Sequence, residues 1–398
     1  MVRILPSLLL LSLGLVSANS MLTSRQESTD QSRRLIVGAP GQILSYDYDG
    51  KTFTLVANSS AAGTAPSWMI FKQPDQLYAV DENSNTTRLF NFNPANGSLS
   101  GQPSFVADGS LGVVSLEFNS NQTYLIGGSY SEGQVDIWDL SSPDVSLKLA
   151  KQIPLPGSLG PDQTTHRAHQ IVLDPTGQFF AVADLGGDAI HFIDSSTWEI
   201  NNSVRVEPAG AGPRHGAFLG GNATSLPKYY AVACESQNLI ILWDIEKTEN
   251  GKINLTNSQT LSTFGDAFPP SNATSAAAGE LLASRNGRDI YVSNRISGNE
   301  TDSISHFLVQ DGKLVFADQV SSGGYIPRQL SFSTDELLVF GTNQGGKNGL
   351  VAFQRCSDEG TLTLAAALPN TETSATANTG PQFIMEVPIL STQEPDQC

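Results

Sequence analysis

Four side chains with complementary chemistry stand at the boundaries of short apolar segments. His169 opens one segment, Arg214 opens the next, and Glu235 and Arg295 each end a later one. Two arginines can hold carboxylate or ester oxygens through paired N–H donors, and a histidine and a glutamate can divide general acid and base roles. An arginine beside an ester carbonyl also stabilises a developing oxyanion. This set predicts chemistry on a small carboxylate or a lactone, without a metal or a cofactor.

Further polar side chains accompany these four. His166 precedes the first histidine by three residues, His215 directly follows Arg214, and Arg328 stands in a second Pro-Arg step at residues 327–328. We expect all three to contact a substrate. Polar residues at strand starts also bond to neighbouring backbone, so Arg214 and His215 are explained about equally well by a structural role, because most buried polar groups are simply satisfied.

The elements that must position these residues are short strands. Apolar and polar residues alternate with a period of two, no long helical periodicity follows the N-terminal segment, and turns rich in Gly, Asn and Pro separate the runs. The runs form groups at a spacing of about 45–65 residues, slightly above that of common propeller repeats. Seven groups are marked by their starts at Pro66, Gly112, His169, Pro213, Ala278, Pro327 and Pro381. The pattern predicts an all-β, seven-bladed β-propeller over residues 34–390.

The last group start predicts how the ring closes. Pro381–Val387 resembles the first strand of a blade but little chain follows it, whereas residues 34–58 supply three strands and no obvious first one. We expect Pro381–Val387 to be the inner strand of the N-terminal blade, beside Gln42–Tyr48, because this pairing removes an open sheet edge. Residues 19–33 are predicted to be a flexible segment, and residues 391–398 a polar tail.

Strand order also predicts where the four side chains meet. In a propeller, the starts of the first strands and the ends of the second strands lie on one face of the ring. His169, Arg214, Glu235 and Arg295 occupy those positions, so they should converge at one mouth of the central channel. In the loop between two of these positions, Asp184 and Asp188 are expected to cap the turn rather than to react.

The N-terminus predicts secretion. Arg3 precedes the short apolar run Leu8–Val16, and small residues at Val16 and Ala18 suit cleavage after residue 18, so residues 1–18 are expected to be a signal peptide. Nine N-x-S/T sequons support a secreted, extracellular glycoprotein; their asparagines are Asn58, Asn85, Asn96, Asn121, Asn201, Asn222, Asn254, Asn272 and Asn299.

Charge and cysteine content narrow the function classes. The formal net charge is −17 and no basic run occurs, which argues against nucleic acid and anionic membranes as partners. Neither a C-x-x-C nor an H-E-x-x-H motif is present, so no zinc site is predicted. Among the three cysteines, Cys356 and Cys398 are the expected disulfide pair, and Cys234 is expected to be a buried hydrophobic residue.

Over residues 35 to 390 the sequence resembles the lactonase-type seven-bladed propellers, which include 6-phosphogluconolactonase and the fungal carboxy-cis,cis-muconate cyclase. The order and spacing of several motifs carry the resemblance: Ala168-His169-Gln170, Ala183-Asp184-Leu185-Gly186, Gly212-Pro213-Arg214-His215, Glu235, Ile290-Tyr291-Val292-Ser293-Asn294-Arg295 and Pro327-Arg328-Gln329-Leu330-Ser331-Phe332. The family's proposed active site is a histidine, two arginines and a glutamate, which correspond here to His169, Arg214, Arg295 and Glu235.

The sequence departs from the family pattern in two motifs and in its expected location. Residues 284–287 read Ser-Arg-Asn-Gly where the family has Ser-Pro-Asp-Gly, and Gln329 replaces a histidine. The named family enzymes also work inside cells, whereas this chain carries a predicted signal peptide. A phosphorylated sugar lactone is therefore a poor expectation.

Three functions remain open from the sequence. The first is an enzyme that hydrolyses a lactone or forms one from an unsaturated acid. The second is a secreted propeller that binds a ligand, a carbohydrate or a protein without catalysis, because propellers host unrelated functions. The third is a structural glycoprotein of the cell wall or surface. Convergence of the four side chains on one concave site would favour the enzyme.

Overall fold

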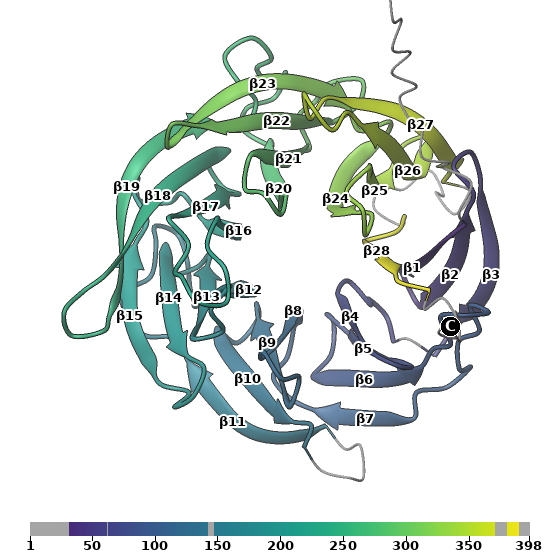
Figure 1. Ribbon diagram of the computed structural model, residues 1–398, viewed down its shortest axis with the longest axis horizontal. Helices are drawn as coiled ribbons and strands as arrows, with labels where there is room; N and C mark the ends of the chain where they lie inside the picture. Colours follow the sequence, from purple (N-terminus) through teal and green to yellow (C-terminus); the bar gives the residue numbers. More distant parts are fainter. Residues whose placement is uncertain (1–31, 62, 142–146, 371–379, 390–398) are drawn as a thin grey trace, which may run out of the picture.

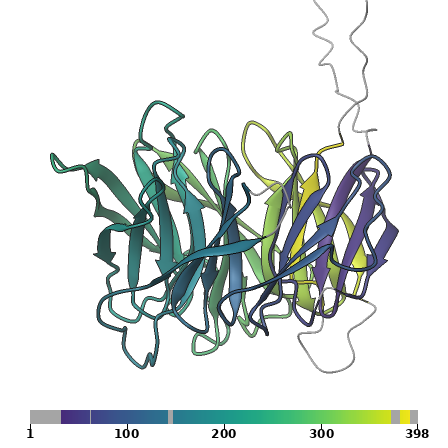
Figure 2. The same ribbon diagram turned by 90° about the horizontal axis from the view of Figure 1, so that it is seen from below.

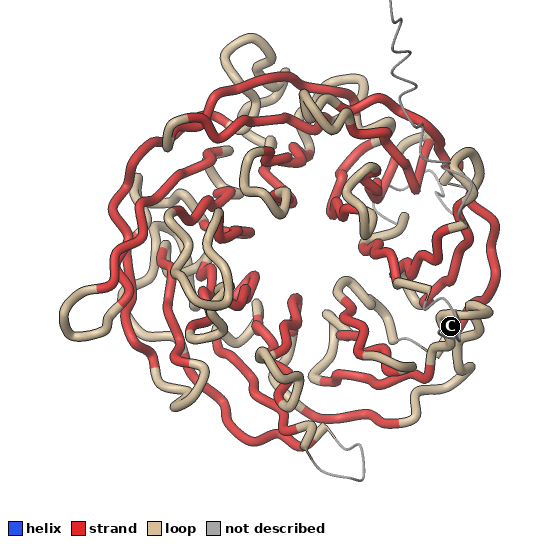
Figure 3. Tube along the Cα trace, viewed as in Figure 1, coloured by secondary structure: helices blue, strands red, loops and turns tan. Residues whose placement is uncertain are grey.

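The computed structural model describes residues 32–61, 63–141, 147–370 and 380–389. The predicted signal peptide, the polar tail and Cys398 lie outside these residues, as does nearly all of the predicted flexible segment. The described residues form strands, turns and loops, without a helix (Figure 3). No helix in this part of the chain is long and apolar enough to cross a membrane.

Seven four-stranded antiparallel sheets stand around a central axis, which confirms the predicted seven-bladed propeller (Figure 1). Figure 2 shows the ring edge-on. From the inner strand outward, the first three blades are β28 (Phe383–Val387), β1 (Arg33–Ala39), β2 (Gln42–Tyr48) and β3 (Phe53–Ser59); β4 (Met69–Lys72), β5 (Gln76–Val80), β6 (Thr86–Asn91) and β7 (Phe105–Asp108); and β8 (Val113–Phe118), β9 (Tyr124–Ser129), β10 (Gln134–Asp139) and β11 (Lys148–Pro154).

The other four blades follow in chain order. They are β12 (Ala168–Leu173), β13 (Phe179–Asp184), β14 (Ala189–Asp194) and β15 (Ile200–Arg205); β16 (Pro213–Leu219), β17 (Tyr229–Cys234), β18 (Leu239–Lys247) and β19 (Ile253–Ser262); β20 (Ala277–Ala283), β21 (Asp289–Arg295), β22 (Ser303–Gln310) and β23 (Lys313–Ser321); and β24 (Tyr325–Phe332), β25 (Leu338–Gly345), β26 (Asn348–Arg355) and β27 (Leu362–Pro369).

The C-terminal strand β28 closes the ring as the inner strand of the N-terminal blade, as predicted. Its predicted neighbour was wrong: β28 pairs with β1, from Arg34 opposite Val387 to Gly38 opposite Phe383, and not with Gln42–Tyr48. The physical reason is the tight turn at Gly41, whose φ of 77° folds β2 back on the far side of β1. Arg33, expected in the flexible segment, begins β1.

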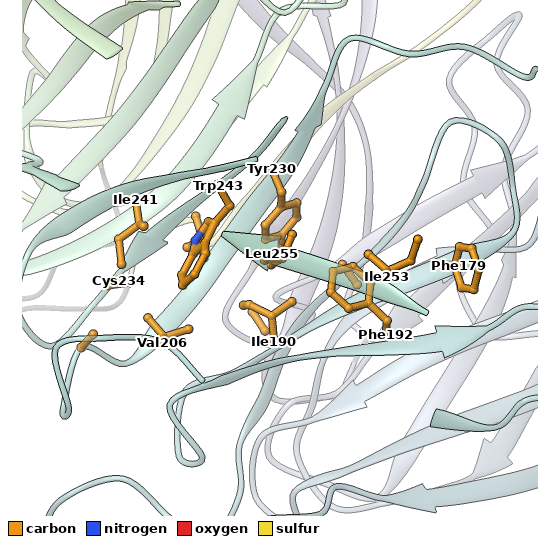
Figure 4. Close-up of a cluster of buried hydrophobic side chains, with 14 residues drawn as sticks. Phe179, Ile190, Phe192, Val206, Tyr230, Cys234, Ile241, Trp243, Ile253 and Leu255 are labelled. Atoms are coloured by element: carbon orange, nitrogen blue, oxygen red, sulfur yellow. The ribbon is translucent and has the colours of Figure 1, made fainter. Parts of the chain in front are cut away.

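Apolar side chains fill the space between neighbouring blades. Figure 4 shows one such cluster, in which Phe192 of β14 and Tyr230, Cys234 and Trp243 of the next blade pack together. Cys234 is fully buried, as predicted. A fully buried aliphatic or aromatic side chain contributes on the order of 1.5–3 kcal/mol, so these clusters fix each blade against the next. Because the blades are held rigidly, the inner strands present their polar ends at fixed positions around the axis.

Candidate active site on the propeller axis

Irregular pairing at the starts of the inner strands re-aims selected side chains. In four of the seven blades the register between the inner strand and its neighbour skips one residue, which is His169 in β12, Arg214 in β16, Arg328 in β24 and Val114 in β8. A β-bulge leaves the extra residue unpaired and turns its side chain out of the regular alternation. All four of these residues line one cavity at the axis. The repeated bulge therefore places these four side chains in the wall of the axial cavity.

The cavity collects residues from every blade. Its volume is about 10 Å³, which is room for about one water molecule. Each of the seven inner strands contributes at least one lining residue, either from the strand itself or from the position next to it: Trp68, Val114, His169, Arg214, Glu280, Arg328 and Gln382. A site of this kind exists only in the closed ring, because no single blade contains it.

Glu235 connects two of the predicted arginines. Its Oε2 lies 2.8 Å from Arg214 Nε and 2.8 Å from Arg295 Nη2. The Arg214 side chain is almost fully buried, while the Glu235 side chain is 28% exposed, so the carboxylate faces the mouth and the guanidinium lies below it. Arg295 Nη2 also donates to the carbonyl oxygen of Ala278 at 2.8 Å.

The backbone holds this pair in register. Asp188, which follows β13 with a φ of 44°, accepts hydrogen bonds from the amides of Gly210 and Gly212 at 2.6 and 2.8 Å. The carbonyl of Gly212 in turn accepts from the amide of Glu235 at 2.8 Å. The capping role predicted for Asp188 thus extends to the placement of Arg214, two residues after Gly212.

Burial and charge set the ionisation of these groups. Burial opposes ionisation of Glu235, but Arg295 and Arg214 outweigh it and lower the pKa of this carboxyl below its ordinary value. Burial and the nearby Arg295 lower the pKa of Arg214, yet an arginine in a protein remains charged at neutral pH. The outer layer of the site is therefore a carboxylate held between two cations.

Two histidines and a glutamate form the deeper layer. The rings of His169 and His215 lie 5.0 Å apart between centroids, and His215 Nδ1 lies 2.7 Å from Glu280 Oε1. Burial, reinforced by the charge of Arg214, lowers the pKa of both histidines well below 6.5. Both imidazoles are therefore neutral at pH 7.

Glu280 was missed by the sequence analysis. Its side chain is 5% exposed, and burial, only partly offset by Arg214, raises its pKa to about 8. It stands in the bulge of β20, where Gly279 and Glu280 together face a single residue of β21. The detectable signal was a lone acid in the apolar strand Ala277–Ala283, near the position that His169 holds in its own blade.

A second arginine–glutamate pair stands at the same mouth. Arg328 Nη2 lies 2.5 Å from Glu82 Oε2, and Glu82 follows β5 as Glu235 follows β17. The sequence analysis selected Arg328 but not its partner. With neutral histidines and a protonated Glu280, three guanidiniums face two ionised carboxylates, which leaves one net positive charge at the mouth.

His166 lies apart from the axial cavity, and its expected role in binding a substrate stays a prediction. It does not line the cavity; its Nδ1 lies 2.5 Å from Asp184 Oδ2, which His191 Nε2 also contacts at 3.1 Å. These three groups lie close enough to hold a metal ion. Asp184 Oδ1 however accepts the amides of Arg167 and Gly187, so every contact of this carboxylate is explained as bracing of the loop, and we assign no metal to it.

Together, these features define a class: seven-bladed propellers with a polar, arginine-rich site where their inner strands meet on the axis. The family model described as "Lactonase, 7-bladed beta-propeller" matches residues 28–375. The chain belongs to this lactonase family.

Relatives and solved structures agree with the family. The chain is 29% identical over 261 residues to the probable 6-phosphogluconolactonase of Arthroderma benhamiae, covering 64% of this chain and 63% of that protein. It is 25% identical over 314 residues to the 6-phosphogluconolactonase of Bacillus subtilis, covering 73% and 83%. The solved structure of the periplasmic gluconolactonase of Pseudomonas aeruginosa is similar with a TM-score of 0.72 and 22% identity, covering 90% and 99%. This last likeness shows the fold alone.

Proposed function

We propose that this protein is a lactonase whose substrate lies at the mouth and extends only its reacting ester group into the axial cavity. The observation that carries the proposal is a set of buried polar atoms without a hydrogen-bond partner within the protein. His169 Nδ1, Arg214 Nη1 and Glu280 Oε2 all belong to residues that line the cavity. An unsatisfied buried polar group costs about 1–3 kcal/mol, so the cavity is suited to one small polar group that offers both acceptors and donors, such as the reacting end of an ester or the attacking water.

The residues divide the chemistry of ester hydrolysis. Arg214 Nη1 and Arg295 Nε are buried without a hydrogen-bond partner within the protein, and they stabilise the oxyanion that forms when water attacks the lactone carbonyl. Neutral His169, with its proton on Nε2, accepts the proton of that water at Nδ1. Glu235 already binds both guanidiniums through Oε2 and has a lowered pKa. Its role is to orient the arginines, and the role of base, for which His169 and Glu235 were alternatives, goes to His169.

The charge of the mouth favours an uncharged lactone. One net positive charge suits the oxyanion and the single carboxylate of the product. A phosphate monoester carries about −1.5 to −2 at neutral pH, and its charge would exceed what the site balances. The lactone-forming reaction of a carboxymuconate would bring several carboxylates to the same place. We therefore favour hydrolysis of an unphosphorylated sugar lactone or a simple aliphatic lactone.

The test is direct hydrolysis by the purified full-length protein. D-glucono-1,5-lactone, its 6-phosphate and δ-valerolactone are each supplied at constant pH, and acid release is followed by titration. We expect acceleration over spontaneous hydrolysis with the unphosphorylated compounds. No acceleration with any lactone would refute the proposal and leave the non-catalytic binding propeller as the better hypothesis.

We further propose that the chain is secreted and glycosylated. Six sequon asparagines are exposed, namely Asn58, Asn85, Asn96, Asn121, Asn222 and Asn272, and three are half-buried, namely Asn201, Asn254 and Asn299. Asn201 also donates its side-chain amide to the carbonyl of Gly251 and accepts from the amide of Ile253, so it is expected to carry no glycan. Peptide mapping of protein secreted from a eukaryotic host, with and without enzymatic deglycosylation, would show which sites are occupied.

A further inference from the structure

Among the described residues, Glu280 is the one buried carboxyl group in the wall of the axial cavity. Its Oε1 accepts the amide of Leu281 at 3.1 Å and faces His215 Nδ1 at 2.7 Å. Its Oε2 has no hydrogen-bond partner within the protein. With His215 in the tautomer that carries its proton on Nδ1, Oε1 accepts from both groups, and the proton of the neutral acid then resides on Oε2. The acid therefore holds a donor that nothing in the protein uses.

The polar groups near Glu280 stand in or directly after five other strands, one of which, β21, belongs to the same blade as Glu280. His169 stands in β12, Arg214 and His215 in β16, and Glu235 after β17. Arg295 ends β21 and Arg328 lies in β24. Arg214 and Arg295 favour ionisation of Glu280, but burial outweighs them. Both guanidiniums also contact Glu235.

We propose that Glu280 is a catalytic residue, the general acid that protonates the ring oxygen of the lactone as it leaves. The inference rests on the proposed lactone hydrolysis and adds to it the group that supplies the second proton. His215 is the positioning residue, since its Nδ1 fixes Oε1 and so directs Oε2 toward the cavity.

The proton balance closes with the groups present. Water adds to the carbonyl carbon and passes one proton to His169 Nδ1. The bond between that carbon and the ring oxygen then breaks, and the ring oxygen takes the proton from Glu280 Oε2 to become a hydroxyl. This leaves an imidazolium and a carboxylate, and transfer of the proton from His169 to Glu280 restores both. His215 lies between them, 5.0 Å from His169 by ring centroids and bonded to Glu280.

The environments of the two glutamates suit different roles: that of Glu280 suits a neutral acid, and that of Glu235 suits an ionised carboxylate. Glu235 is 28% exposed and contacts two arginines, whereas Glu280 is 5% exposed and contacts a neutral histidine. Burial raises the pKa of Glu280 to about 8, and the arginines lower that of Glu235. Carboxyls whose environments push their pKa values apart are the usual pattern of divided roles.

The experiment compares leaving groups. A general acid is needed for the alkoxide leaving group of δ-valerolactone and hardly at all for the phenolate leaving group of dihydrocoumarin, which has the same ring size. In Glu280→Gln we expect kcat for δ-valerolactone to fall about 100-fold or more and kcat for dihydrocoumarin to change less than about threefold. The wild-type decline of activity above about pH 8, where Glu280 loses its proton, should be absent from the residual activity.

A matched control removes another acid whose pKa is raised by burial. Glu117 lies in inner strand β8, outside the cavity lining, and burial raises its pKa to about 7. Glu117→Gln should leave both rates and the pH profile unchanged. Glu280→Asp, which keeps the acid but retracts it, should retain the alkaline decline.

Three outcomes would overturn the assignment. Equal loss on both lactones in Glu280→Gln would mean that Glu280 only shapes the site. An unchanged alkaline decline in Glu280→Gln, measured on any lactone that the wild type hydrolyses, would assign that proton to another group. A wild-type protein without lactonase activity would refute the proposed function and this inference together, whereas the first two outcomes refute only the role of Glu280.

Discussion

Replacing Glu235 by glutamine tests whether the carboxylate holds the two arginines in place. The change keeps the shape of the side chain and removes the charge that faces Arg214 and Arg295, each at 2.8 Å. Removing one partner of a buried ion pair costs about 3–5 kcal/mol, and an exposed pair contributes about 0–1 kcal/mol. The Arg214 side chain is 2% exposed and that of Glu235 28%, so we expect a loss of about 2–4 kcal/mol in the free energy of unfolding.

Glu82→Gln is the matched comparison. Glu82 has nearly the same exposure, 27%, but contacts the single guanidinium of Arg328, which is 16% exposed. We expect this variant to lose about 1 kcal/mol. Both losses are measured by denaturant unfolding followed through tryptophan fluorescence. If Glu235→Gln loses no more than Glu82→Gln, the view of Glu235 as the counterion of a buried cation is wrong, and Arg214 is stabilised by other contacts.

Three further outcomes are expected. Arg214→Lys keeps the charge but loses the planar fork, so kcat/KM for a lactone should fall about 10²-fold; loss of stability without a specific loss of turnover would contradict this. Asp188→Asn tolerates the positive φ but loses an acceptor to Gly210 or Gly212, and thermal or denaturant unfolding should show a cost of about 1–3 kcal/mol. Ending the chain at residue 379 removes β28 and exposes the edge of β1, so size-exclusion chromatography should show aggregates; a folded monomer would argue against closure by β28.

The main lines of the site followed from the sequence, because strand order fixes which ends share a face. His169, Arg214, Glu235 and Arg295 needed only that rule to be placed at one mouth. Glu280 was not predicted as a site residue, because apolar alternation does not reveal a β-bulge. An acid within the strand Ala277–Ala283 also gave no turn signal. His166 does not join the axial cavity, because its ring contacts Asp184 instead, and nothing in the sequence indicated that contact.

The outermost strands were the weak part of the fold prediction. β11 is exposed over most of its length and β15 is mostly half-buried, so they lack the apolar alternation that marked their inner neighbours. The three N-terminal strands were counted correctly, but β28 was paired with the wrong one. Pairing order within a blade depends on the turn at Gly41, and the alternation on either side of that turn is compatible with both orders.

Ring closure by β28 also has a consequence for synthesis of the chain. The hydrogen bond from Arg33 to the Glu386 carboxylate joins residues that are 353 positions apart in the sequence. At about 5–20 residues per second, β1 leaves the ribosome about 18–70 s before its partner exists. During that interval the apolar edge at Leu35–Val37 has no inner neighbour, and Gln382 has not joined the cavity wall. A chain in this state needs protection from association with other chains, and it acquires its complete site only when the last blade is sealed.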